Sequence, residues 1–342
     1  MQPSYKKYDQ IKKEGFTMKL AIIGSGMIVN DFLPMVSDIP GIELETIVGT
    51  DRSIAKMNDL KKTYGINEVS TNYEECLKNE RVDTVYIALP NHLHFSYAKQ
   101  ALLNKKNVIC EKPFTLKLSE MQELKELALA NHVILLEAIT NQYLTNYKKI
   151  KEAVGTIGDI KIIECNYSQY SSRYDAFKRG EILPAFNPKM GGGALMDINI
   201  YNIHFVTGLF GEPQKVNYLA NVEKGIDTSG ILSIDYGDKK VVCIGAKDST
   251  APIRTIIQGN EGAIIIDGAT GTLDHFTVIN RQNESKLVDC KVHTHRMYEE
   301  FLEFERIIRE ADFETMKKQL DHSEMVMAVV DKSLVTAGIS LG

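Results

Sequence analysis

A lysine stands directly after a run of residues that is typical of a buried strand. Residues 107–110 form that run, and Glu111, Lys112 and Pro113 follow it. Proline fixes φ and lacks a backbone donor, so we expect the strand to end here and the lysine to be held. Ligands of open α/β sheets bind beyond the carboxyl ends of the strands. Because a buried ammonium needs a partner, Lys112 is either a solvated surface lysine or the electrostatic centre of a site.

A glycine loop precedes this lysine along the chain. It follows an apolar run, residues 19–23, and opens a segment, residues 27–37, that has the pattern of a helix. The spacing matches the first two glycines of G-x-G-x-x-G, which let a pyrophosphate approach a helix N-terminus. Val29 replaces the third glycine, and we expect it to loosen the contact between helix and strand. A plain tight turn is the alternative. The candidate cofactor residues are Gly24, Ser25, Gly26, Met27 and Ile28.

Two further strand ends carry polar residues. The strand at 42–49 is followed by Thr50, Asp51 and Arg52. An acidic residue here favours NAD through the ribose 2′-hydroxyl and an arginine favours NADP through the 2′-phosphate, so the sequence leaves NAD or NADP open. The strand at 83–89 is followed by residues that could contact the nicotinamide ribose or phosphate, although Asn91 is equally suited to a helix N-cap. We expect Glu111 either to pair with Lys112 or to bind the nicotinamide ribose. The candidates at this second strand end are Leu89, Pro90, Asn91, His92 and His94.

A third group of polar residues lies near position 200. Gly191 to Gly193 precede a segment in which Asp197, Tyr201 and His204 are spaced i, i+4 and i+7, on one face of a helix. The glycines would let backbone approach a ligand closely. His204 either lines the site or packs under it. Residues 171–189 are an ordinary surface connection or a loop that covers the substrate, with Arg173, Tyr174 and Asn187 as candidate substrate contacts.

The order of these elements predicts the fold class, which is α/β. Strands alternate with helices up to about residue 137, which predicts an N-terminal Rossmann domain, a doubly wound parallel sheet, over residues 18–137. Six strand-like runs and two hairpin signals follow, at residues 236–239 and 259–262. We therefore expect residues 138–342 to form an α+β domain with a large, mainly antiparallel open sheet that binds substrate and oligomerises. The last helix is a candidate to pack back on the first domain, and residues 1–17 are an N-terminal extension.

Composition restricts the function classes. The chain has 342 residues, 44% of them hydrophobic, and a net charge of −5, which gives no reason to expect a nucleic-acid partner. Five cysteines without a C-x-x-C pair indicate reduced thiols and a cytoplasmic protein. No apolar run approaches the ~20 residues that span a bilayer, so we expect no membrane partner. No grouping of residues predicts a metal site.

Taken together, these motifs resemble the Gfo/Idh/MocA family of NAD(P)-dependent oxidoreductases. The supporting segments are residues 21–28, 89–94, 108–113 and 191–201, so the resemblance spans Met18 to about Leu341. Many family members have a histidine at the position of Tyr201. A tyrosine there is similar to the branch that contains glucose–fructose oxidoreductase and dimeric dihydrodiol dehydrogenase. The resemblance implies that Lys112, Asp197 and Tyr201 form the catalytic group, and that the chain is a homodimer or homotetramer assembled through the sheet of the second domain.

The resemblance also implies a reaction. A hydride would move between nicotinamide and a secondary alcohol or carbonyl carbon of a sugar, polyol or diol. Tyr201 would be the acid/base, Lys112 would favour its phenolate and polarise the substrate oxygen, and Asp197 would orient the substrate or Lys112. An NAD-dependent glycosidase and a non-catalytic cofactor-sensing regulator stay as alternatives. Trapping net cofactor reduction distinguishes the glycosidase from the dehydrogenase, because the glycosidase predicts sugar release without it. The presence of both Lys112 and Tyr201 argues against the regulator.

Overall fold

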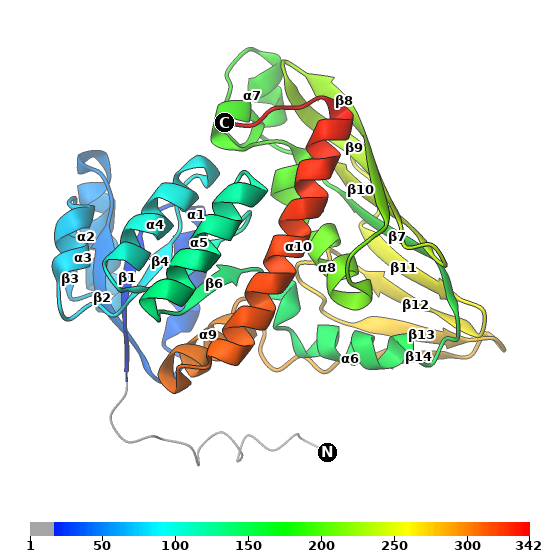
Figure 1. The fold of residues 1–342 in the computed structure, drawn as a ribbon, viewed down its shortest axis with the longest axis horizontal. Helices are drawn as coiled ribbons and strands as arrows, with labels where there is room; N and C mark the ends of the chain where they lie inside the picture. The colour runs from blue at the N-terminus through cyan, green and yellow to red at the C-terminus, as the bar shows by residue number, and fades with distance from the viewer. Residues whose placement is uncertain (1–16) are drawn as a thin grey trace.

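A computed structural model describes residues 17–342. All but Thr17 of the predicted N-terminal extension lies outside the described residues. The molecule has two sheets, and the long helix α10 (Phe313–Ala337) crosses between them (Figure 1).

The first sheet is the predicted doubly wound parallel sheet. Its six strands lie in the order β3-β2-β1-β4-β5-β6, and every neighbouring pair is parallel. The central strands β1 and β4 are almost fully buried because helices cover both faces of such a sheet. They are β1 (Met18–Ile23), β2 (Ile42–Val48), β3 (Glu68–Ser70), β4 (Thr84–Ile87), β5 (Asn107–Glu111) and β6 (Leu135–Ala138).

Helices connect these strands, in keeping with the predicted alternation of strands and helices. α2 ends at Gly65 in the left-handed conformation, as the glycine predicts. The N-cap of α5 is Lys117. The helices of this half are α1 (Met27–Val36), α2 (Ile54–Tyr64), α3 (Tyr73–Lys78), α4 (His94–Leu103) and α5 (Leu118–Asn131).

The second sheet has eight strands in the order β14-β13-β12-β11-β7-β10-β9-β8. Only β7 and β10 pair in parallel, so the expectation of a mainly antiparallel sheet is confirmed. Both predicted hairpins form, between β9 and β10 and between β11 and β12. The strands are β7 (Ile160–Ser168), β8 (Lys215–Glu223), β9 (Ile226–Asp235), β10 (Lys240–Ala246), β11 (Arg254–Gly259), β12 (Gly262–Asp267), β13 (Phe276–Asn280) and β14 (Ser285–Val288).

Helices cover one face of this second sheet and leave the other face bare (Figure 1). Several large apolar side chains are exposed on its strands, among them Leu219, Ile231 and Leu287. Leu219 and Ile231 are directly paired across β8 and β9. The remaining helices are α6 (Thr145–Val154), α7 (Tyr174–Lys178), α8 (Ile200–Phe210) and α9 (Tyr298–Glu310).

α10 joins the two halves of the molecule. It packs against β8 and α8 on one side and against α5 and β6 on the other. Lys125 of α5 pairs with Asp321 and Glu324 of α10, and Ser323 donates to the buried Glu137 of β6 at 2.6 Å. The carboxyl ends of the parallel strands are therefore held at a fixed position beside the second sheet.

Candidate active site

The glycine loop lies at the carboxyl end of β1. Gly24 has φ +117°, and a Cβ there would lie 2.4 Å from the carbonyl oxygen of Ala88, so only glycine fits. Gly26 is the N-cap of α1, and a Cβ built on it meets no atom within 4 Å among residues 17–342. Open space in front of a helix N-terminus fits a pyrophosphate. Val29 is fully buried in the core, so it fills the helix–strand contact that we expected it to loosen.

The next strand end along the sheet carries the residues expected to select between NAD and NADP. Thr50 to Ser53 form a turn in which Thr50 and Ser53 cap each other. Asp51 and Arg52 are both exposed, and neither forms an ion pair within the described part of the chain. Lys56 of α2 reaches across to the carbonyl oxygen of Ser25. The glycine loop and this turn therefore lie next to each other.

The segment after β4 divides into pocket residues and a structural histidine. Leu89, Pro90 and Asn91 line the pocket described below. Asn91 is not a helix N-cap; its amide donates to the carbonyl of Gly191 at 2.8 Å and so links the two halves of the molecule. His94 is fully buried between the carbonyls of Pro113 and Leu89, and it does not reach the pocket. His92 has a buried Nδ1 without a hydrogen-bond partner among residues 17–342.

Lys112 follows β5 and points into the pocket. Its Nζ donates to the backbone oxygen of Asp197 at 2.7 Å, lies 3.5 Å from Asp197 Oδ1, and lies 4.8 Å from the centre of the Tyr201 ring. Lys112 therefore brings together the three residues predicted to be catalytic. Glu111 does not pair with Lys112: its carboxylate accepts a hydrogen bond from Tyr86 at 2.6 Å, and it also lines the pocket.

The helical face predicted to hold Asp197, Tyr201 and His204 is divided. Residues Leu195–Asn199 form a π-helical turn before α8 begins. Because such a turn is wider than an α-helical turn, the regular i, i+4, i+7 face is broken. Asp197 and Tyr201 line the pocket, whereas His204 packs beneath it, with Nδ1 3.0 Å from His322 Nε2 and Nε2 3.5 Å from Glu137.

The three glycines before this turn serve packing. All three are buried, and a Cβ at Gly192 would meet the backbone of residues 184–187 at under 3 Å. At Gly193 a Cβ would lie 2.1 Å from Asp227. Gly192 and Gly193 therefore let this segment pack closely against the 184–187 loop and against Asp227 of β9.

The predicted substrate residues of the 171–189 segment are not among the residues that line the pocket, although Arg173 contacts Met27, which does. Arg173 contacts the sulfur of Met27, and Tyr174 donates to Glu223. Asn187 accepts from the backbone of Lys189. Of residues 171–189, only Pro184 lines the pocket.

Sequence reasoning missed three side chains that complete the site. Lys247, directly after β10, has only 3% of its side chain exposed and lies 2.7 Å from Asp197 Oδ2. Tyr167 of β7 lines the pocket, its ring 6.4 Å from that of Tyr201. Arg296 lines it too and is held by Asp31 of α1 at 2.6 Å. These residues belong to no motif, and only a strand end marks Lys247.

Burial and charge compete in this cluster. Burial alone would raise the pKa of Asp197, but Lys112 and Lys247 outweigh it and lower that pKa to about 2. Burial favours the neutral amine of Lys112, yet Tyr201 and Asp197 raise its pKa above the ordinary value. For Tyr201 burial prevails over the nearby Lys112 and Arg296, so its pKa is raised. Lys112 therefore favours the phenolate of Tyr201, as expected, but burial outweighs it, so near neutral pH Lys112 is charged and Tyr201 is a protonated phenol.

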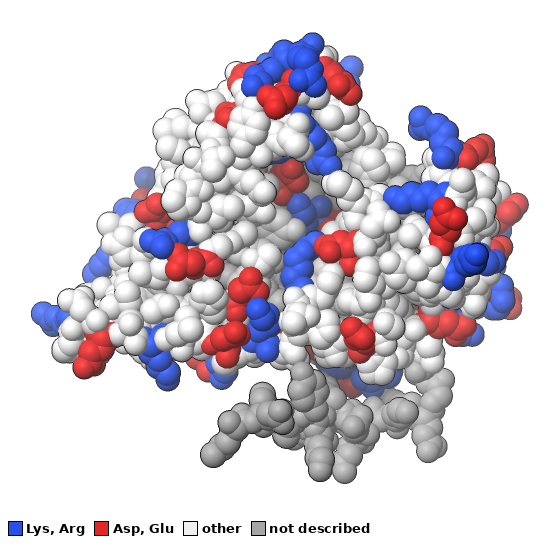
Figure 2. All heavy atoms as spheres, turned by 180° about the vertical axis from the view of Figure 1, so that it is seen from behind, with Lys and Arg blue, Asp and Glu red and all other residues white. Residues whose placement is uncertain are grey.

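These residues surround one pocket of about 820 Å³ between the two halves of the molecule. Figure 2 shows charged side chains of both signs inside this hollow. Its walls include the glycine loop, the ends of β4 and β5, the π-helical turn, and the loop at residues 269–272. A dinucleotide on the glycine loop and a small polar substrate beside Lys112 and Tyr201 would share this space.

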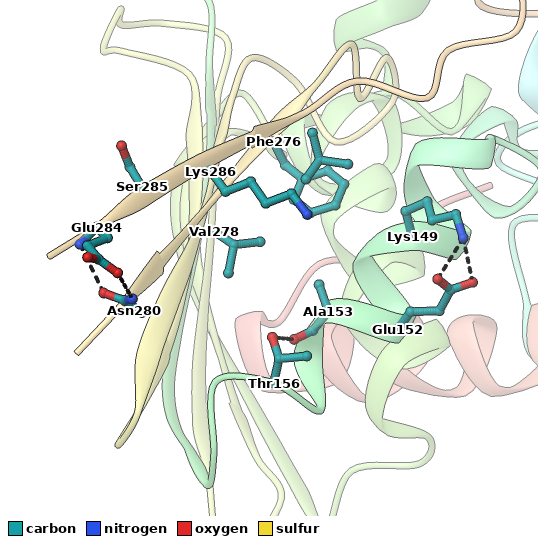
Figure 3. A pocket seen from close by; sticks show the side chains of 11 residues that line it. Lys149, Glu152, Ala153, Thr156, Phe276, Val278, Asn280, Glu284, Ser285 and Lys286 are labelled. Atoms are coloured by element: carbon teal, nitrogen blue, oxygen red, sulfur yellow. Dashed lines mark hydrogen bonds and ion pairs between the residues drawn. The ribbon is translucent and has the colours of Figure 1, made fainter. Parts of the chain in front are cut away.

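A second hollow of about 470 Å³ lies between α6 and the hairpin of β13 and β14 (Figure 3). Its floor includes Phe276 and Val278. Lys149 pairs with Glu152 at its rim, and Glu284 accepts from Asn280. Because no predicted site residue lies there, it is not a candidate active site.

Within residues 17–342, no three or more His, Cys, Asp or Glu side chains are grouped so that they could hold a metal ion. The same residues contain no helix long and apolar enough to cross a membrane.

Family models match both halves of the chain. Residues 18–139 match the oxidoreductase family with an NAD-binding Rossmann fold, and residues 147–273 match the GFO/IDH/MocA C-terminal domain. The chain is 31% identical over 327 residues to scyllo-inositol 2-dehydrogenase (NADP(+)) IolU of Bacillus subtilis (strain 168). The aligned region covers 94% of this chain and 98% of that protein. The chain belongs to the Gfo/Idh/MocA family. As a member, it is an oxidoreductase that uses a nicotinamide dinucleotide.

Two further proteins are similar to this chain at lower sequence identity. Trans-1,2-dihydrobenzene-1,2-diol dehydrogenase of Xenopus tropicalis is 27% identical over 338 residues, 94% of this chain and 98% of that protein. The crystal structure of KijD10, a 3-ketoreductase from Actinomadura kijaniata, in complex with NADP and TDP-benzene has a TM-score of 0.80 and 18% identity, covering 93% and 98% of the two chains. This structural likeness confirms the fold.

Proposed function

We propose that this chain moves a hydride between a nicotinamide dinucleotide and a secondary alcohol or carbonyl carbon of a sugar, polyol or diol. The observation that carries the proposal is the contact of Lys112 with both Asp197 and Tyr201, in the pocket that Gly26, Met27 and Ile28 also line. When bound, the nicotinamide supplies or accepts the hydride at its C4 atom.

The residues of the pocket supply the proton and the charge. Tyr201, a protonated phenol, would donate its proton to the substrate oxygen during carbonyl reduction, and in the reverse reaction its phenolate would take the proton of the alcohol. The Lys112 ammonium stabilises negative charge that develops on this oxygen. Asp197 holds Lys112 through its backbone oxygen at 2.7 Å, with its carboxylate farther away, at 3.5 Å.

The polar groups around the pocket favour a substrate with several hydroxyl groups. Asn91, Glu111, Tyr167 and Thr272 line it and offer donors and acceptors on several sides. Relatives are named for scyllo-inositol, for trans-1,2-dihydrobenzene-1,2-diol and for D-xylose. Fluorescence titration with NADH and NADPH, followed by turnover assays on polyols, diols and aldoses, tests the proposal. Turnover of none of these with either cofactor would overturn it, and sugar release without net cofactor reduction would indicate the glycosidase reaction.

Within this function, we propose that Arg52 selects NADP(H). Its side chain is exposed and forms no ion pair with the rest of the described chain, so it is available to a 2′-phosphate. Two relatives carry NADP(+) in their names. Arg52→Ala is expected to weaken NADPH binding about tenfold, the contribution of one charge-assisted hydrogen bond, and to leave NADH binding unchanged. Asp51→Ala is the matched control, and equal effects of both changes on both cofactors would contradict the assignment.

We also propose that the bare face of the second sheet forms a homodimer or homotetramer interface. Leu219 and Ile231 are exposed side by side on this face. Exposed apolar patches of this kind mark sites of protein–protein contact. Light scattering measures the mass directly, and a monomer at micromolar concentration would exclude the interface.

The free cysteines, four of them buried, support the proposal of a cytoplasmic protein.

A further inference from the structure

Lys247 is a buried ammonium that the reaction described above does not use. It follows β10, with its backbone fixed by bonds between its N–H and the carbonyl of Thr228 and between its carbonyl and the N–H of Ser171. Its Nζ lies 2.7 Å from Asp197 Oδ2, donates to the carbonyl of Ala185 at 2.6 Å, and lies 4.4 Å from the centre of the Phe186 ring. A buried lysine needs such partners because desolvation of an ammonium is costly.

The two lysines around Asp197 hold different parts of it. Lys112 makes its short bond, 2.7 Å, with the backbone oxygen, and lies 3.5 Å from the carboxylate. Lys247 makes the short contact with the carboxylate, 2.7 Å. The short contact of the Asp197 carboxylate is therefore with Lys247, although the charges of both lysines act on it, and the short contact of Lys112 is with a neutral carbonyl.

This division affects what Lys112 can do. An ammonium has three N–H groups. A carboxylate in close contact would take one or two of them and neutralise the charge that the substrate oxygen needs. With the carboxylate drawn to Lys247, Lys112 keeps its charge and free N–H groups beside Tyr201.

We propose that Lys247 is a positioning residue of the hydride-transfer site, which holds the Asp197 carboxylate away from Lys112 so that the Lys112 ammonium can act on the substrate oxygen. The proposal rests on the function proposed above. Lys247 lies behind Asp197 and outside the pocket lining, so it acts through Asp197 and not on the substrate.

Lys247 also ties Asp197 to the loop that borders the pocket. Ala185, whose carbonyl it binds, is next to Pro184, which lines the pocket. One ammonium thus fixes the position of a site carboxylate relative to the pocket wall. A displacement of about 1 Å in a catalytic group can cost about 10²-fold in rate.

Kinetics of matched variants test this inference. Lys247→Met is expected to lower kcat by about 10- to 10²-fold with unchanged cofactor affinity, and Lys247→Arg is expected to restore part of kcat. Lys224→Met is the control, because Lys224 also bonds a carbonyl, that of Phe177, and lies 4.7 Å from the ring of that residue, but has no partner in the site. It is expected to keep wild-type kcat.

A double-mutant cycle separates positioning from a general structural role. In an Asp197→Asn background, Lys247→Met is expected to have little further effect on kcat, because the carboxylate that it restrains is gone. The same loss in both backgrounds, or wild-type kcat in Lys247→Met alone, would overturn the inference.

A crystal structure of Lys247→Met gives a readout without turnover. The distance from Asp197 Oδ1 to Lys112 Nζ is expected to shorten from 3.5 Å to about 2.8 Å, the length of a charge-assisted hydrogen bond. A carboxylate that stays in place would overturn the inference. An inactive wild-type protein would refute the proposed function and leave this geometric result to decide the role of Lys247.

Discussion

Replacement of Lys112 by alanine is the change most informative about the proposed reaction. The lost charge lies 4.8 Å from the centre of the Tyr201 ring, and in the proposed reaction it acts on an oxygen at a comparable distance. A unit charge at that distance, in an effective dielectric of about 20, contributes about 3.5 kcal/mol. That energy corresponds to about 10²- to 10³-fold in rate. Because Asp197 keeps Lys247 as a partner, we expect the variant to fold.

The assay compares kcat and cofactor affinity on the same preparation. We expect Lys112→Ala to lose about 10²- to 10³-fold in kcat and to bind cofactor as the wild type does, because the glycine loop is untouched. Lys106→Ala is the matched control: Lys106 precedes β5 at its other end and donates to the carbonyls of Asn79 and Val82. It is expected to lose stability without a specific loss of kcat. A Lys112→Ala enzyme with near-wild-type kcat on a confirmed substrate would refute the assignment.

Three further predictions concern the same site. Tyr201→Phe is expected to lower kcat by about 10²- to 10⁴-fold, measured by steady-state kinetics, and a small effect would exclude Tyr201 as the proton donor. Gly24→Ala places a Cβ 2.4 Å from the carbonyl oxygen of Ala88. We therefore expect calorimetry to show a loss of about 1–3 kcal/mol in the free energy of unfolding and titration to show weaker cofactor binding. An unchanged Tm would contradict the strain at this position. The Asp197 carboxylate, with its pKa lowered from 3.8 to about 2, stabilises the fold above the unfolded pKa, and this stability is lost as pH falls through the folded pKa. Asp197→Asn is therefore expected to be less stable than the wild type at neutral pH, and denaturant titrations should show the difference shrinking between pH 4 and pH 2.

The local elements of the fold could be predicted because each carries its own signal. β5 ends before Pro113, α2 ends at Gly65, and the hairpins follow turn residues. Lys112 could be found because a cation after a buried strand conflicts with ordinary packing. β13 and β14 were missed, since these strands at the edge of the sheet are only partly apolar.

The rest of the site depends on contacts that no local pattern encodes. Lys247 meets Asp197 across 50 residues of sequence, and Arg296 meets Asp31 across 265. The direction in which His204 points depends on the π-helical turn before it, which the spacing of polar residues did not reveal. The state of Tyr201 required the balance of burial against two cations, a quantity that exists only in the folded molecule.

The position of α10 has a consequence for how the chain is completed during synthesis. β6 is the edge strand of the first sheet, and the backbone N–H of Leu135 in that strand donates to the sulfur of Met316 in α10. The residues that cover this edge are therefore translated about 180 positions after it. Until the ribosome delivers them, the nascent Rossmann sheet presents an open strand, the kind of edge at which aggregation begins. Cells that produce this protein in quantity are expected to depend on chaperones during that interval.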